Sequence, residues 1–200
     1  GITPVGDARL TTGAFSTGFW TDGVNSGILL TNGDAINAAG PNVNDGSTGF
    51  ASMAGDADLD TEFGLDPLIG PTTMDTTSLE FDFETLGGDV FFQFVFASEE
   101  YNEWTNSMFN DVFGFFLDGV NIALIPGTTT PVSINNVNGG NPFGTNASNP
   151  EFYHNNDPDE NGLFMDLIGY DGFTDVFTAE ALGLAAGTHT IKLVVSDVSD

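Results

Sequence analysis

Six consecutive residues, Asp157-Pro158-Asp159-Glu160-Asn161-Gly162, have the clearest ligand-like spacing in the chain. Oxygen-bearing side chains stand at the first, third and fifth positions and glycine at the sixth, as in the first half of a calcium loop. The twelfth position holds Ile168 instead of glutamate, so the segment is not an EF-hand and needs Asp166, Asp171 or a distant group to close it. The pattern predicts a metal site that includes Asp157, Asp159 and Asn161. A polar turn without a metal is the alternative.

A second acidic triplet consists of Asp56, Asp58 and Asp60. Three carboxylates within five residues repel one another unless a cation lies among them, so we predict that they are also metal ligands. The alternative is a helix N-terminus at which Asp58 or Asp60 serves as the cap. In that case the apolar residues of the segment face the core, namely Leu59, Phe63 and Leu65.

A third group of oxygen ligands follows the most hydrophobic predicted strand. It comprises Glu99, Glu100, Asn110 and Asp111. Carboxylates beside apolar runs are costly unless they are paired or bound to metal, so these four residues are further candidate ligands. The alternative is a solvated loop in which Tyr101 and Trp104 pack over the edge of the fold.

Enzymatic chemistry has weaker support. The segment Glu80-Phe81-Asp82-Phe83-Glu84 resembles the carboxylate ladder of jelly-roll glycoside hydrolases, which use paired acids in a cleft. Any half-buried strand of so acidic a chain gives the same pattern, and the chain has two Trp to serve as sugar platforms. The residues His154 and His189 cannot form a His-rich zinc site, and there is no HExxH, GxSxG or P-loop motif. We therefore predict no catalytic residues and no enzyme.

Charge limits the classes of partner. The 200 residues include 29 Asp and Glu against two basic residues, Arg9 and Lys192, which gives a net charge of −27. A polyanion such as nucleic acid, or an anionic lipid surface, requires basic residues that are missing here. No run of about 18 apolar residues predicts a membrane span, and without Cys there is neither a disulfide nor a thiolate metal site. So many unpaired carboxylates indicate a surface adapted to high salt, bound Ca²⁺, or both.

Strand patterns dominate the rest of the chain. Residues 78–84 alternate apolar and acidic side chains, and residues 89–96 are nearly all apolar, which predicts a central strand. Glycines 87 and 88 between them indicate a hairpin turn. Further strands are predicted at residues 26–31, 112–117, 120–125, 175–181 and 188–196, and a helical turn at 163–168. The expected fold is all-β: a single β-sandwich or jelly roll over residues 1–200, with long Ca²⁺-binding loops and one or two short helices.

Several of these segments together resemble the choice-of-anchor L domain of bacterial surface proteins. The resemblance extends from about Ser26 to the end and is strongest in the central block. The segments that carry it are residues 55–60, 98–101, 110–117, 121–128, 131–135, 170–174 and 189–193. In the family, the pattern continues past Asp197-Val198-Ser199-Asp200 into a further strand. The resemblance therefore implies a module of a larger surface protein, and either the chain is cut at this point or the last strand of the sandwich is missing.

The acidic, Lys-poor composition is similar to the peptide-binding modules of large calcium-dependent RTX adhesins. The resemblance implies an extracellular, monomeric module that binds several Ca²⁺ ions and grips the free C-terminus of a protein on a target cell. An ion would then meet the terminal carboxylate, and the ion-site candidates would be the acidic and amide residues given above together with Asp171. The residues expected at the ligand are Tyr101, Trp104, Tyr153, Asn155, Asn156 and Tyr170.

The resulting hypothesis is a calcium-dependent, peptide-binding adhesin domain. Two alternatives use the same ions: a lectin in which Ca²⁺ binds sugar hydroxyls, and a spacer that the ions merely stiffen.

Overall fold

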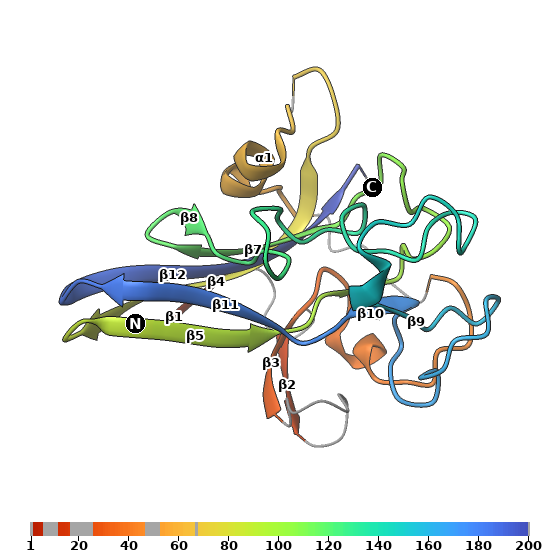
Figure 1. The fold of residues 1–200 in the computed structure, drawn as a ribbon, viewed down its shortest axis with the longest axis horizontal. Coiled ribbons are helices and arrows are strands. Elements are labelled where there is room, and N and C mark those ends of the chain that lie inside the picture. The colour runs from red at the N-terminus through yellow and green to blue at the C-terminus, as the bar shows by residue number, and fades with distance from the viewer. Residues whose placement is uncertain (1, 6–11, 17–25, 47–52, 67, 200) are drawn as a thin grey trace.

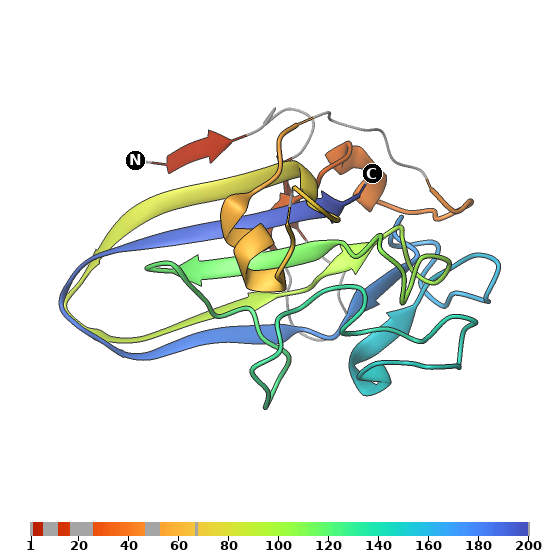
Figure 2. The same cartoon turned by 90° about the horizontal axis from the view of Figure 1, so that it is seen from above.

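The structure is a computed structural model, and it describes residues 2–5, 12–16, 26–46, 53–66 and 68–199. The fold is an antiparallel, mostly β structure, which confirms the all-β prediction. Its largest layer is a five-stranded sheet in the order β1-β4-β12-β7-β8. These strands are β1 (Ile2–Val5), β4 (Thr73–Thr85), β12 (Gly187–Val198), β7 (Val112–Leu117) and β8 (Val120–Asn121). Figure 2 shows β4, β12 and β7 side by side, with β4 and β12 the longest strands.

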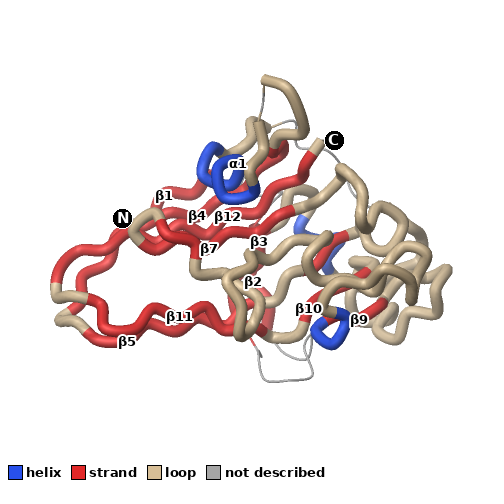
Figure 3. The backbone as a smooth tube through the Cα atoms, turned by 45° about the horizontal axis from the view of Figure 1, so that its top comes forward, coloured by secondary structure: helices blue, strands red, loops and turns tan. Residues whose placement is uncertain are grey.

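A two-stranded ribbon faces this sheet as a second layer (Figures 1 and 3). It pairs β5 (Gly88–Phe94) with β11 (Phe177–Leu184). A turn at Gly87, which has a φ of 99°, carries the chain from β4 to β5. The predicted hairpin is wrong, because β4 and β5 belong to different sheets and do not pair with each other. The prediction that residues 89–96 form a central strand is wrong. Among the described residues β5 pairs with β11 alone, and its side chains alternate between exposed and half-buried because one face looks to solvent.

Aromatic and aliphatic side chains of both layers fill the space between them. The fully buried Phe115 and Ile191 of the large sheet pack with Ala179 of the ribbon. The Phe92 ring of β5 meets the Phe115 ring edge-on at 4.8 Å between centroids. The alternation that predicts the strands from sequence thus also defines the two facing layers of the core.

A short helix, α1 (Ala57–Phe63), covers the outer face of the large sheet (Figures 1 and 2). Asp56 caps it, because its carboxylate accepts hydrogen bonds from the amides of Asp58 and Leu59. The helix ends at Gly64, whose φ of 66° is the left-handed conformation typical of helix ends. Leu59 is fully buried against the sheet. The acidic triplet is therefore a helix N-terminus, although the cap is Asp56 instead of the expected Asp58 or Asp60.

At the other end of the molecule, long loops surround a small sheet in the order β6-β10-β9 (Figure 1). Its strands are β6 (Ala97–Ser98), β10 (Gly172–Thr174) and β9 (Tyr153–Asn155). The remaining elements are β2 (Thr12–Ser16), β3 (Ser26–Leu30), and the short 3-10 helices η1 (Ala35–Ala38) and η2 (Pro150–Phe152). Residues 163–168 form no helix, but the amides of Leu167 and Ile168 both donate to the carbonyl of Phe164, which makes one turn with helical hydrogen bonding, as predicted. No helix in the described part of the chain is long and apolar enough to span a membrane.

Candidate metal centre

The register of the small sheet gathers acidic residues at one of its ends. The central strand β10 begins at Gly172, which pairs with Ser98 on one side and with Asn155 on the other. Because β10 is antiparallel to both neighbours, the chain leaves β6 and β9 at the same end at which it enters β10. The residues just outside these strands, Glu99, Asp157 and Asp171, therefore lie at one edge of the sheet.

Three carboxylates come close enough together there to share one cation. Oxygen atoms of Asp45, Glu103 and Asp157 all lie within 4.8 Å of one another. Asp157 is only 2% exposed, whereas Asp45 and Glu103 are exposed to solvent. Partial burial, together with the negative charges of Asp157 and Asp45, raises the pKa of Glu103 to about 7. Solvent therefore reaches the group from the side of Asp45 and Glu103 but not from the side of Asp157.

Hydrogen bonds fix the buried carboxylate of this group. Oδ1 of Asp157 accepts from the amides of Asp159 at 2.7 Å and Glu160 at 3.1 Å. Oδ2 lies 3.4 Å from Nδ2 of Asn102. Asn102 is itself held by the hydroxyl of Tyr153, which donates to its Oδ1 at 2.7 Å. A ligand oriented in this way needs little reorganisation when an ion binds.

A fourth carboxylate lies behind the group, in the interior. Asp171 has no exposed surface, and Nδ2 of Asn42 donates to its Oδ1 at 2.7 Å. Within the described residues, Oδ2 of Asp171 and Oδ1 of Asn42 are buried and have no hydrogen-bond donor. Burial raises the pKa of Asp171 to about 9; the bond from Asn42 opposes this, and the charges of Glu99, Glu103 and Asp157 add to the rise. Two buried acceptors without donors, beside several carboxylates, are what a cation would satisfy.

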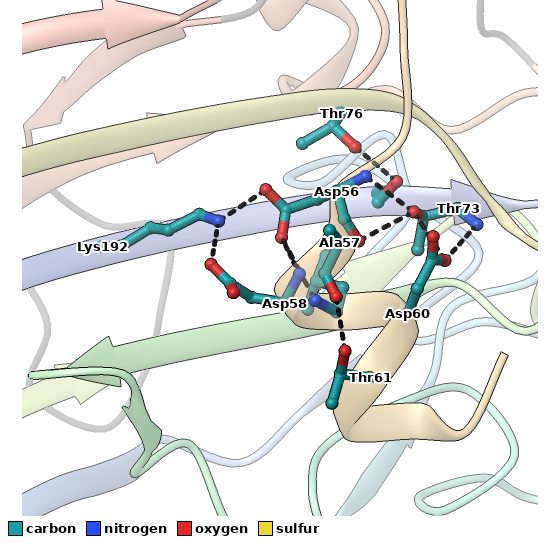
Figure 4. A network of polar contacts seen from close by, with 10 residues as sticks. Asp56, Ala57, Asp58, Asp60, Thr61, Thr73, Thr76 and Lys192 are labelled. Carbon is teal, nitrogen blue, oxygen red and sulfur yellow. Dashed lines mark hydrogen bonds and ion pairs between the residues drawn. The ribbon is translucent and has the colours of Figure 1, made fainter.

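The basic side chain that the structure describes is engaged elsewhere. Nζ of Lys192 lies 2.6 Å from carboxylate oxygens of both Asp56 and Asp58 at the start of α1 (Figure 4). Burial alone would lower the pKa of Lys192, but the two carboxylates outweigh burial and raise it. The acidic end of the small sheet is thus electrostatically uncompensated by any lysine or arginine among the described residues. The candidate metal ligands at this end of the sheet are all oxygen atoms. Such a set suits Ca²⁺, which prefers six to eight oxygen ligands, better than zinc.

Comparison with protein families identifies the fold. The model of the choice-of-anchor L domain matches residues 3–200. The chain belongs to the choice-of-anchor L domain family. Membership implies a bacterial protein of the cell surface or extracellular space. Comparisons with curated proteins and with solved structures found no match.

In this choice-of-anchor L domain the predicted ligands divide between several places. Asp157 belongs to the candidate metal group, and the buried Asp171 and Glu99 interact electrostatically beside it. Asp159 and Asn161 are exposed on the loop beside it. Asp111 is buried and accepts from Oγ of Ser98 at 2.7 Å. The remaining predicted ligands have protein contacts or partial exposure elsewhere, namely Glu100, Asn110, Asp56, Asp58 and Asp60.

The residues predicted at the ligand fall into three groups. Tyr101 is fully buried, and its hydroxyl donates to the carbonyl of Val137 at 2.7 Å. The hydroxyl of Tyr170 donates to Oγ1 of Thr31 at 3.0 Å. Trp104, directly after Glu103, is 48% exposed. The others, Tyr153, Asn155 and Asn156, lie on β9 or just after it and support the loop that carries Asp157.

Three residues of the centre were missed from the sequence: Asn42, Asp45 and Glu103. A signal was present for two of them. Asn42-Val43-Asn44-Asp45-Gly46 also combines oxygen side chains with a closing glycine, as residues 157–162 do. Glu103 has no local signal, because its position depends on how the loop after β6 folds back toward β9.

Proposed function

We propose that this domain is the calcium-dependent ligand-binding module of an RTX-type adhesin on a bacterial cell surface. In this proposal Ca²⁺ occupies the group formed by Asp45, Glu103 and Asp157, and holds the C-terminal carboxylate of a partner peptide. The adhesin context and the peptide ligand come from the resemblance; the geometry supports the ion and its accessibility.

The observation that carries the proposal is the one-sided exposure of the group. Asp157 would hold an ion from the buried side, while the exposed Asp45 and Glu103 leave the solvent side accessible to an external oxygen. A chain of net charge −27 repels a carboxylate. A bound Ca²⁺ reverses the local field, and a carboxylate can then complete its coordination shell. The exposed Trp104 ring beside Glu103 offers a surface for the side chain of the ligand.

Calorimetric titration of the metal-free protein with Ca²⁺ tests the ion. Asp157→Asn removes one charge from the buried side of the group and should weaken binding by more than the roughly 10- to 100-fold typical of losing an outer-shell partner. Glu180→Gln is the matched control, because Glu180 is exposed on β11, outside the small sheet that carries the acidic group. Equal affinities in the two variants would contradict the proposed site.

Arrays of peptides and glycans, read with calcium and with chelator, test the ligand. We expect calcium-dependent binding to peptides that end in a free carboxylate and loss of binding when the same peptides end in an amide. Binding to sugars alone would support the lectin alternative. Calcium-dependent stabilisation without binding to either array would support the spacer.

A further inference from the structure

Aspartate followed by glycine occurs four times in the chain, at residues 22, 45, 118 and 171. In this dipeptide the glycine amide can attack the aspartyl side chain, because no Cβ hinders the approach. The first pair lies outside the described residues. The other three differ greatly in how the structure holds them.

Two of these pairs are restrained. Asp118 is exposed, but its Oδ2 lies 2.6 Å from Nδ1 of His189 and its Oδ1 accepts from the amide of Thr190 at 2.9 Å. Asp171 is fully buried, and its glycine, Gly172, is held in β10 between two neighbouring strands. In both pairs, moving Cγ of the aspartate onto the amide nitrogen of the following glycine would break native hydrogen bonds, which for Asp171–Gly172 include those of the sheet.

The pair Asp45–Gly46 lacks such restraints among the described residues. Both residues are exposed. A Cβ added at Gly46 would meet nothing within 4 Å among the described residues, so the backbone has room to rearrange there, as it does at Gly119. The side-chain interaction assigned to Asp45 is with Glu103, another carboxylate, instead of a main-chain donor.

We propose that Asp45–Gly46 is a site of spontaneous isomerisation and that a cation bound at the acidic group suppresses it. The amide nitrogen of Gly46 bonds to Cγ of Asp45, and the carboxyl oxygen leaves with two protons as water, giving a cyclic imide. Water then adds to one of the two imide carbonyls and cleaves its C–N bond. Cleavage at the main-chain carbonyl leaves an isoaspartyl link, in which the backbone passes through the side chain. The mass of the product equals that of the starting chain.

The change removes one candidate ligand, the carboxylate of Asp45, from the acidic group. An isoaspartyl link adds a methylene to the backbone and transfers the free carboxylate to the former main-chain carbon. The carboxylate of residue 45 then leaves its position within 4.8 Å of Glu103 and Asp157. A bound cation would hold the carboxylate in the group and keep Cγ from the Gly46 amide. This protective half of the inference rests on the proposed calcium site; the isomerisation itself does not.

The experiment incubates the full chain at neutral pH and physiological temperature, in chelator and in millimolar calcium. Protein digests are mapped for isoaspartate with protein isoaspartyl methyltransferase, and calcium affinity is measured on the same samples. In chelator we expect isoaspartate at residue 45 to exceed that at residues 118 and 171 several-fold. Calcium should reduce it several-fold, and the aged sample should bind calcium more weakly. Asp45→Glu keeps a carboxylate but requires a larger ring, so it should accumulate little product there.

Each result separates the two proposals. Absence of isoaspartate at residue 45 in chelator, or equal amounts at all three described pairs, overturns the inference and leaves the calcium site untouched. Calcium binding without protection overturns the protective half alone. Product at residue 45 together with no calcium binding in fresh protein overturns the proposed function while the modification site stands.

Discussion

The buried carboxylate of Asp171 predicts an unusual response to pH in metal-free protein. Its ordinary pKa is 3.8, and burial raises the pKa to about 9 in the folded state. The folded state therefore holds the proton more tightly than the unfolded chain does. The contribution to stability is complete below pH 3.8 and is lost as the pH rises toward about 9. Each pH unit in this range costs about 1.4 kcal/mol, so about 4 kcal/mol is lost by neutral pH.

Asp171→Asn should remove this dependence. An asparagine keeps an acceptor for Nδ2 of Asn42 and carries no charge to desolvate. In chelator at about pH 7 the variant should be more stable by up to ~4 kcal/mol. For a chain of this length that corresponds to a rise of roughly 8–16 °C in the midpoint of thermal unfolding. At about pH 4 the variant and the parent should unfold at nearly the same temperature.

Thermal unfolding followed by circular dichroism measures the effect, with Glu180→Gln as the charge-matched control. In calcium the parent should become the more stable of the two, because the negative charge of Asp171 attracts an ion bound at the neighbouring group and the variant has no charge there. If the chelated variant and parent lose stability equally between acidic and neutral pH, Asp171 does not carry a proton in the metal-free fold, and the electrostatic description of the centre is wrong.

Two further predictions concern the framework. Lys192→Met keeps the aliphatic packing but leaves Asp56, 14% exposed, without its cation, and should cost about 3 kcal/mol in denaturant unfolding. Asp58→Asn, at a carboxylate that is 60% exposed, should cost little, and equal effects would show that Asp56 does not depend on Lys192. Tyr101→Phe removes the donor to the buried carbonyl of Val137 and should lower stability by about 1–3 kcal/mol in thermal unfolding. An unchanged midpoint would mean that another donor reaches this carbonyl.

Local sequence patterns predicted most of the strands because alternation of side chains is itself the cause of a two-faced strand. Residues 78–84 form part of β4, and residues 112–117 are β7. The same reasoning failed for residues 89–96. Apolar side chains on both faces indicated a central strand, yet Phe91 is exposed in a ribbon of two strands. Burial of a strand depends on which strands pair with it, and no local pattern encodes that.

The candidate centre was predictable only in part for a related reason. Asp157 and Asp171 stand in or near a recognisable loop, so spacing alone pointed to them. Asp45 and Glu103 join Asp157 from segments more than 50 residues away in the chain. Glu103 follows β6, which pairs with β10, whereas the segment of Asp45 is held by the hydrogen bonds of Asn42 to Asn156 and Asp171. At Asp56 the same spacing also suits a helix cap. The structure shows that Asp56 caps α1 and forms an ion pair with Lys192 of β12.

The order of strands in the large sheet has a mechanical consequence. β1 and β12 are both antiparallel to β4, so they run parallel to each other on its two sides. A tensile force applied between Ile2 and Val198 would pull these strands in opposite directions along their length. The interstrand hydrogen bonds lie across that direction and would be loaded together in shear, instead of opening one after another as in a zipper. The three strands β1, β4 and β12 are therefore oriented so that their hydrogen bonds resist extension together.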